Sequence, residues 1–361
     1  MASPTAADGG DPDLATLARA ARWLAAGHRV ALATVVETWG SAPRGVGSHL
    51  AVRADGLFAG SISGGCVEGD VVAAASALLA KDTSVRELTF GVANETAWRA
   101  GLACGGRIRI LIENLNRNQA FLAPTLAAAR ARIGAWRLIA LDDGADCWGA
   151  GNATAQGPLV EDAAAAGLAL PPQTASGSRL MTLTERSVFL RVYEPARRLV
   201  ITGAVHIAAY LARFAGALGY QVMVIDPRGA FLDAFRTQMP DDPAVTVIED
   251  WPDEVFLRQP LDAWSALVTL THDPKIDDAA LQAALASPAF YIGALGSRRT
   301  QAARLARLAK RGWSERDLAR IHGPVGLAIG AKGPAEIAVS ILAEIVAAAR
   351  TPKDRAGENA G

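Results

Sequence analysis

A glycine-rich segment with a cysteine is the first feature of this sequence that could do chemistry. Ser63-Gly64-Gly65-Cys66 leads into an apolar helical pattern that begins at Val67. We predict that Cys66 lies in the first turn of that helix, among unpaired N–H donors, a setting that favours the thiolate over the thiol. Glu68 would oppose the thiolate as a like charge or serve as a base. The alternative for Cys66 is a small buried hydrophobe.

Two further segments resemble this one in composition. Cys104-Gly105-Gly106 places a second cysteine beside glycines, and the upstream turn Gly40-Ser41-Ala42-Pro43-Arg44 adds a hydroxyl and a guanidinium. We expect Cys66 to be the working thiol and Cys104 its nearer helper. Cys147 has no flanking signature and is expected to be structural. Three cysteines without a C-x-x-C spacing are not the pattern of a zinc site or a disulfide framework.

A candidate dinucleotide-binding loop lies in the second half of the chain. Gly203-Ala204-Val205-His206 stands between a strand pattern and a helix pattern. Asp226 ends the next strand pattern about 20 residues further on, which is the spacing of a ribose-binding acid. The fingerprint G-x-G-x-x-G needs its second glycine so that the backbone can approach a pyrophosphate, and Val205 stands there instead. Two interpretations stay open: an NAD-binding loop, and a Rossmann scaffold with a modified pocket.

Two more polar loops follow strand patterns in this half. One contains His272 and Asp273, and the other contains Gly296, Ser297, Arg298 and Arg299 at the start of a helix pattern. N–H groups at a helix start, joined by guanidinium groups, make an anion site. A solvated helix start is the alternative for either arginine alone, and His272 could equally cap a helix or be a satisfied buried histidine. Because open α/β sheets bind ligands where their strands end, we expect these loops to converge on one pocket.

Composition limits the classes of protein that the chain can belong to. Its 361 residues suggest two domains, and 36 basic against 36 acidic residues give no net charge and a pI near 7.0. This balance is not that of a nucleic-acid-binding chain. The hydrophobic fraction of 51% and the mean hydropathy of +0.19 exclude disorder. No apolar run approaches the ~20 residues of a membrane span, and residues 1–13 are not typical of a signal peptide. We therefore expect a cytoplasmic protein without a membrane partner.

The order of strand and helix patterns predicts an α/β protein. The first half mixes the two kinds of pattern, with helices over 14–26, 67–80 and 118–133 and strands over 28–36, 49–52, 57–59, 85–90, 108–112 and 136–141. The second half alternates short buried strands with helices, which indicates a parallel sheet with right-handed crossovers. We predict an N-terminal mixed α/β domain (12–150), a linker with a closing strand (151–194) and a C-terminal Rossmann-like domain (195–350).

Six segments in this order resemble one known family, the xanthine dehydrogenase accessory factors of the XdhC/CoxI type. The resemblance runs from about Leu14 to Arg350 and rests on residues 37–44, 63–68, 101–106, 271–275, 291–299 and 334–338. Two positions depart from the family's pattern. Val205 stands where the family often has glycine, and Ala328 where an aspartate is common.

The resemblance implies a maturation factor that holds the molybdenum cofactor as cargo. Such proteins protect a molybdopterin-type cofactor while a cysteine desulfurase sulfurates it, and help to insert it into a molybdenum hydroxylase apoenzyme such as xanthine dehydrogenase. A terminal phosphate and a soft, dithiolene-bound metal call for an anion cradle and a thiolate. On this basis Cys66 is the expected metal contact and Arg298 with Arg299 the expected phosphate contact, and a homodimer is a further expectation.

Two other functions remain as alternatives. One is an NAD(P)-dependent oxidoreductase that uses the Rossmann half, against which Val205 counts. The other is a scaffold that joins partner proteins without a ligand, against which the polar loops in both halves count. Hydride transfer by the purified protein, or retention of molybdenum and an oxidisable pterin, would separate the alternatives.

Overall fold

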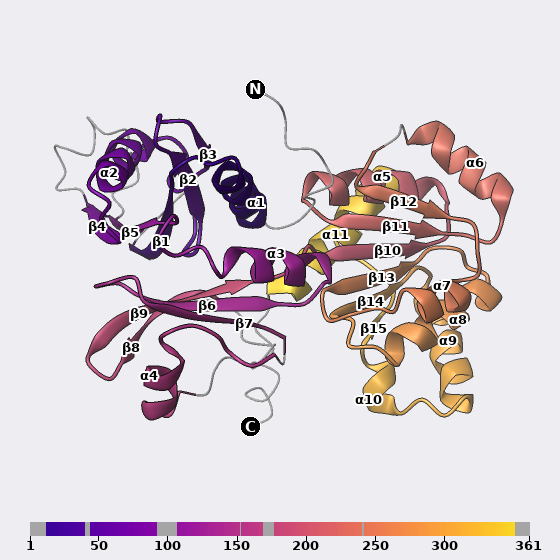
Figure 1. The fold of residues 1–361 in the computed structure, drawn as a ribbon. Coiled ribbons are helices and arrows are strands. Elements are labelled where there is room, and N and C mark those ends of the chain that lie inside the picture. The colour runs from indigo at the N-terminus through magenta and orange to yellow at the C-terminus, as the bar shows by residue number, and fades with distance from the viewer. Residues whose placement is uncertain are drawn as a thin grey trace. The chain divides into compact units, whose positions relative to one another are not determined.

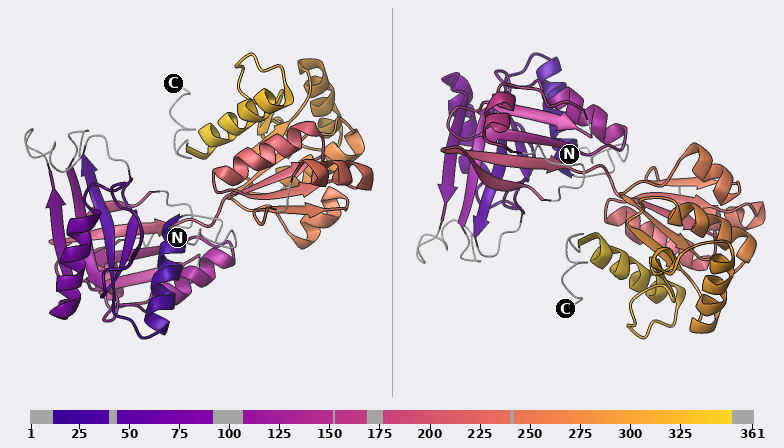
Figure 2. Two further views of the ribbon diagram at one scale, coloured as in Figure 1. Left: turned by 90° about the horizontal axis from the view of Figure 1, so that it is seen from above. Right: turned by 90° about the horizontal axis from the view of Figure 1, so that it is seen from below.

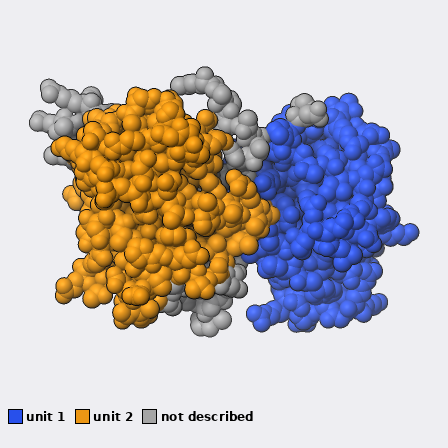
Figure 3. Space-filling view, viewed as in Figure 1, with its two compact units in different colours: residues 1–10, 196–361 blue, residues 11–195 orange. Residues whose placement is uncertain are grey.

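The computed structural model describes residues 12–39, 44–91, 107–151, 153–168, 177–239 and 242–350. The chain divides after Pro195 into two compact units, drawn in different colours in Figure 3. Residues 11–195 are called the N-terminal unit below, and residues 196–361 the C-terminal unit. Each unit is described by itself.

The N-terminal unit begins with a five-stranded antiparallel sheet in the order β3-β2-β1-β5-β4. Its strands are β1 (Val30–Trp39), β2 (His49–Arg53), β3 (Phe58–Gly60), β4 (Val85–Phe90) and β5 (Arg107–Asn114). Helices α1 (Pro12–Ala25) and α2 (Glu68–Ala80) cover opposite faces of this sheet (Figure 1). The central strand β1 is therefore buried on both faces, which explains its continuous apolar run.

A second antiparallel sheet of the same unit has the order β7-β6-β9-β8. It contains β6 (Ala135–Ala140), β7 (Asp146–Ala150), β8 (Arg179–Leu183) and β9 (Arg186–Tyr193), with helices α3 (Leu122–Arg130) and α4 (Val160–Ala165). Residues 151–194 are thus not the predicted linker with one closing strand, because α4 and the β8–β9 hairpin belong to this sheet and its core.

A buried ionic group joins the two sheets of the N-terminal unit. Arg137 of β6 donates two hydrogen bonds to Glu113 of β5, at 2.8 and 2.7 Å, and one to Asp146 of β7 at 2.6 Å. All three side chains are at most 4% exposed. The Arg137 guanidinium also lies 3.6 Å from the centre of the Phe121 ring. One arginine therefore satisfies two carboxylates that would otherwise be buried without a counter-charge.

The C-terminal unit contains a six-stranded parallel sheet in the order β12-β11-β10-β13-β14-β15. Its strands are β10 (Arg198–Thr202), β11 (Gln221–Ile225), β12 (Val245–Ile248), β13 (Ser265–Thr269), β14 (Tyr291–Ala294) and β15 (Ile321–His322). The strand order reverses between β10 and β13, which is the position where open α/β sheets bind ligands. The Rossmann-like prediction for this half is confirmed.

Helices cover both faces of the parallel sheet (Figure 2). One face packs against α5 (His206–Ala217), α6 (Gly229–Gln238) and α11 (Pro334–Arg350). The other packs against α7 (Pro252–Arg258), α8 (Pro274–Leu285), α9 (Arg298–Lys310) and α10 (Glu315–Leu318). In the described part of the chain, every helix is too short or too polar to span a membrane.

Several element bounds differ from the sequence predictions for local reasons. The helix predicted over 118–133 begins at Leu122, because the Asn118 side chain donates instead to the carbonyl of Gly144 at 2.9 Å. Helix α8 begins at Pro274, ahead of the predicted 277, because Asp273 caps it by accepting from the N–H of Lys275 at 2.9 Å. Helix α9 has the predicted bounds.

Candidate functional site

The predicted cysteine segment is a loop between β3 and α2, here called the Cys66 loop (Ser61–Val67). It starts beside β2, where the N–H of Ser61 donates to the carbonyl of His49 at 3.1 Å. Gly60 just before it has φ +90°, and a Cβ there would lie 2.4 Å from the same carbonyl oxygen, so only glycine fits. Gly64 and Gly65 also have positive φ and are exposed. Glycine is therefore required for the path of this loop.

Three side chains accept every N–H of the loop from Ile62 to Val67. Glu68 accepts from Ile62 (3.3 Å), Ser63 (3.0 Å) and Gly65 (2.9 Å). Ser61 Oγ accepts from Gly64 at 3.1 Å, and Ser63 Oγ accepts from Cys66 and Val67, both at 3.0 Å. The prediction of unpaired N–H donors around Cys66 is therefore wrong, because the two serines and Glu68 have taken them. Helix α2 itself begins one residue later than predicted, at Glu68.

Glu68 is the residue that organises the loop. Besides the three N–H groups, its carboxylate accepts from the hydroxyl of Ser61 at 2.9 Å and from that of Ser63. Burial by itself would raise the pKa of Glu68, but the hydrogen bonds from Ser63 and Ser61 lower it from 4.5 to about 2. Such a carboxylate accepts a proton poorly at neutral pH, so the interpretation of Glu68 as a base is wrong.

Cys66 is half-buried at the end of this loop, packed beside the core under α2. It is neither fully enclosed, as the buried-hydrophobe alternative requires, nor freely exposed. Cys147 in β7 is buried, and burial raises its pKa to about 12, which fits the expected structural role. Ser41, Cys104 and Gly105 lie outside the described residues.

Arg44 lies against the Cys66 loop, as its inclusion among the candidate residues requires. Its Nε donates to the carbonyl of Ser61 at 3.2 Å, and its guanidinium is 3.4 Å from Asp13 of α1. Asp13 also accepts from the N–H of His49 at 2.8 Å and from Arg191 of β9 at 3.1 Å. The loop is thus connected through Arg44 to a buried polar group that sequence reasoning missed.

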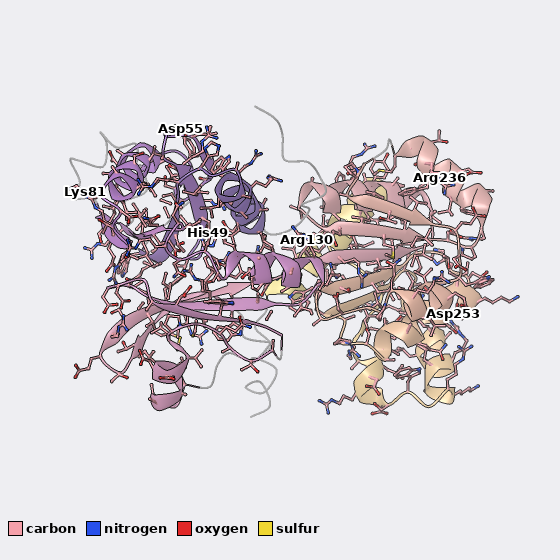
Figure 4. All side chains as sticks on the ribbon, in the orientation of Figure 1. His49, Asp55, Lys81, Arg130, Arg236 and Asp253 are labelled. Atoms are coloured by element: carbon pink, nitrogen blue, oxygen red, sulfur yellow. The ribbon has the colours of Figure 1, made fainter. Side chains whose placement is uncertain are left out.

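His49 is the centre of that buried group and is labelled within the N-terminal unit in Figure 4. Its ring nitrogens lie 3.0 Å from the hydroxyl of Thr34 and 3.2 Å from that of Tyr193. Burial, and then the nearby charge of Arg191, keep the pKa of His49 well below 6.5, so the ring is neutral. His49 and Tyr193 are 144 residues apart, and no local pattern could have joined them.

In the C-terminal unit, the loops after β10 and β13 pack directly against each other. Gly203 has φ +104°, and a Cβ there would lie 2.6 Å from the Thr271 methyl group and 3.1 Å from the Thr271 nitrogen. Val205 has extended backbone and packs against the core beside α5. Within the described residues, the N–H groups of Val205, His206 and Ile207 have no acceptor. The start of α5 is therefore open to a hydrogen-bond acceptor.

Asp226 has a fully buried carboxylate at the end of β11. It accepts from the N–H of Ala204 at 2.9 Å and from Arg228 through its N–H at 3.0 Å and its guanidinium at 2.8 Å. Burial would raise the pKa of Asp226, but the hydrogen bonds from Arg228 and Ala204 lower it. In this structure Asp226 fixes the loop after β10 and positions Arg228.

The loops after β13 and β14 provide the other predicted residues. His272 is exposed, with φ +65°, a strained conformation for a histidine that clusters at functional sites. Ser297 caps α9 by accepting from the N–H of Thr300 at 3.1 Å. Arg298 and Arg299 are exposed at the start of α9 and have no carboxylate partner among the residues described. Their positive charge is therefore available to an anion.

The structure sorts the predicted residues into two groups, one in each unit. Arg44, Ser63, Gly64, Gly65, Cys66 and Glu68 form the Cys66 loop and its support. Gly203, His206, Asp226, His272, Asp273, Gly296, Ser297, Arg298 and Arg299 lie at the carboxyl ends of β10, β11, β13 and β14, which is one edge of one sheet. Among the described residues, no three His, Cys, Asp or Glu side chains gather as metal ligands.

A carboxylate–histidine pair at the same sheet edge was missed by the sequence reasoning. Glu344 of α11 lies 2.9 Å from His322 Nδ1 of β15, and accepts from the hydroxyl of Tyr291 at 2.6 Å and the N–H of Gly326 at 2.6 Å. The Tyr291 and His322 rings are 4.6 Å apart. Burial would raise the pKa of Glu344, but these hydrogen bonds lower it and keep the carboxylate ionised. The pair orients one histidine toward solvent, with its side chain 40% exposed.

Comparisons with known proteins agree with this arrangement. Residues 23–91 match the XdhC and CoxI family, and residues 199–345 match the XdhC Rossmann domain. The molybdenum cofactor insertion chaperone PaoD of Escherichia coli K12 is 29% identical over 327 residues, which are 89% of this chain and 84% of PaoD. A Bacillus subtilis 168 protein, named as a probable component of xanthine dehydrogenase, is 28% identical over 332 residues, 87% of this chain and 92% of that protein.

The fold also has a counterpart among solved structures. A crystal structure from Bacillus halodurans, described as a xanthine dehydrogenase, superposes with a TM-score of 0.70 at 24% identity, and the match covers 96% of this chain and 98% of that one. The architecture of both units is therefore shared with a protein of distant sequence.

Proposed function

Because the chain belongs to the XdhC and CoxI family, we propose that it is an accessory protein that carries the molybdenum cofactor. In this proposal it holds the cofactor while a cysteine desulfurase supplies sulfur, and then delivers it to a molybdenum hydroxylase apoenzyme such as xanthine dehydrogenase. The observation that carries the proposal is the similarity to a protein named a molybdenum cofactor insertion chaperone, which extends over 89% of this chain and so includes both units.

The residues of the N-terminal unit fit a soft metal that arrives with ligands of its own. The described residues hold no group of three metal-binding side chains, so they do not form a resident metal site. A half-buried cysteine on a loop of fixed shape can add a single sulfur ligand to a metal that is already bound by a dithiolene. Cys66 is the residue proposed for that contact.

The residues of the C-terminal unit fit a phosphate group. Arg298 and Arg299 present two guanidinium groups without a carboxylate partner in the described structure, at the start of a helix, which is the positive end of the helix dipole. Guanidinium groups bind phosphate through paired, charge-assisted hydrogen bonds. We therefore assign the phosphate contact to this end of α9.

Two observations count against the NAD(P)-dependent oxidoreductase. Val205 keeps its branched side chain at the position where the fingerprint needs glycine, and packs it into the core. Asp226, at the position of the ribose-binding acid, uses its carboxylate to bind Ala204 and Arg228. A nucleotide ribose would have to displace these hydrogen bonds.

The direct test is to purify the full chain from a host that makes molybdenum cofactor and from a mutant host that does not. Molybdenum and oxidised pterin, measured per chain, should be present only in the first preparation. Cys66→Ser should lose both, and Cys147→Ser, which removes the buried cysteine, serves as the matched control. Turnover of NADH or NADPH without retained pterin would refute the carrier and favour the oxidoreductase.

A further inference from the structure

The N–H groups in front of α2 form a row that the chain itself has filled. Six consecutive N–H groups, from Ile62 to Val67, end on oxygens of Ser61, Ser63 and Glu68. Rows of this kind at the start of a helix are concave anion sites in many proteins, where they bind phosphate. Here the anion at that position is the carboxylate of the chain's own Glu68.

We infer that Glu68 is a specificity-determining residue, which occupies the anion site of the Cys66 loop and thereby excludes phosphate from it. The inference rests on the proposed function and deepens it. The loop meets the cargo at its metal end, through the Cys66 sulfur, and does not bind its phosphate.

The contacts of Glu68 explain why it stays in place. Its Oε1 accepts from the Ser61 hydroxyl and from the N–H groups of Ile62 and Ser63, and its Oε2 accepts from Gly65 and the Ser63 hydroxyl. Glu68 is only 8% exposed and is the first residue of α2. A phosphate entering the loop would have to break these bonds while remaining next to a displaced carboxylate of the same charge.

The start of α9 offers the opposite environment, and this contrast is the reason for the assignment. Arg298 and Arg299 stand there without a carboxylate partner among the described residues, whereas the start of α2 has a buried carboxylate. The two helix starts therefore differ in the sign of the charge that they present, and only the one at α9 attracts an anion.

The first experiment uses the wild-type chain. The rate of Cys66 alkylation by iodoacetamide is measured with inorganic phosphate and with sodium chloride at the same ionic strength. We expect the two rates to agree within about twofold, since screening alone is common to both salts. A clear slowing that is specific to phosphate would mean that Glu68 yields its place, and would overturn the inference.

The second experiment empties the anion site. In Glu68→Ala, phosphate or acetate should raise the melting temperature above the value in chloride, because the vacated N–H row can now bind an anion. The matched control is Asp70→Ala, which removes an exposed acid from the first turn of the same helix and should respond like the wild type. A folded Glu68→Ala chain that gains nothing from either anion contradicts the inference.

These measurements separate the inference from the proposed function. Molybdenum and pterin retention is read on the wild-type chain alone, and a wild-type chain that retains neither refutes the carrier. The effect of phosphate on Cys66 alkylation is still measurable on that chain and still decides the role of Glu68. If Glu68→Ala does not fold, the wild-type alkylation rates alone decide it.

Discussion

The buried arginine between the two sheets of the N-terminal unit allows a quantitative prediction. Arg137→Met keeps much of the length of the side chain and removes the guanidinium, which leaves Glu113 and Asp146 buried without a counter-charge. Removal of one partner from a buried ion pair costs about 3–5 kcal/mol. Because whole domains are stable by roughly 5–15 kcal/mol, the loss is a large part of the stability of this unit.

The loss should also depend on pH. Burial raises the pKa of Glu113 even in the presence of Arg137, and without the guanidinium it should rise further. An acid whose pKa is higher in the folded than in the unfolded chain destabilises the fold when it is ionised, and this penalty disappears as the pH falls below the unfolded value. Arg137→Met should therefore lose less stability at about pH 5 than at about pH 8.

Amide hydrogen exchange is the suitable assay, because two units need not unfold in one transition. Peptides from β5 and β6 should lose protection in Arg137→Met, whereas peptides from β10 and β13 serve as the internal reference. The control variant Arg186→Met removes a more exposed arginine that pairs with Asp142, and should cost at most about 1 kcal/mol. Protection in β5 and β6 that matches the control, or a loss that is the same at both pH values, would refute this reasoning.

Three further predictions concern the two candidate sites. Iodoacetamide near neutral pH should modify Cys66 and spare Cys147, whose pKa is raised to about 12 by burial, as peptide mass mapping can show; equal labelling would contradict this. Replacement of both Arg298 and Arg299 by Ala should weaken retention of the cargo and reduce its dependence on salt, measured by pterin content against ionic strength; unchanged retention at low salt would move the phosphate contact elsewhere. The pKa of Glu68 is lowered from 4.5 to about 2, so the stability it gives the loop is complete above about pH 4.5 and is lost as the pH falls toward 2, and exchange of the loop's amides should quicken over that range.

Much of the C-terminal unit could be predicted from the sequence because its strands are buried on both faces. The runs at β10, β11 and β13 are continuously apolar and are separated by helical patterns, and helix α9 has the predicted bounds. The strand β12 was missed because its residues are only half-buried, so its pattern is weak. In the N-terminal unit, β7 and β8 were missed because they are short antiparallel strands in a stretch rich in glycine and small polar residues.

The candidate sites were predictable only in part. The positions of Cys66 and Arg298 next to helix starts could be predicted, since those depend on local sequence alone. The occupation of the loop's N–H groups could not, because it depends on where the Glu68 side chain points after α2 has formed. The contacts of His49 with Tyr193, and of His322 with Glu344, join residues that only the folded chain brings together.

The position of α11 has a consequence for how the chain matures during its synthesis. Ala338, Ile341 and Ile345 of this helix complete the core that begins with Leu199 of β10, so most of the C-terminal unit separates the two sides of one packed face in the sequence. A ribosome makes the sheet and α5 well before it makes their cover. Until then, the apolar face of the nascent sheet remains open to other chains, and chaperone binding should be strongest in this interval. A nascent chain arrested before residue 334 should therefore aggregate more readily than one that has emerged beyond residue 350.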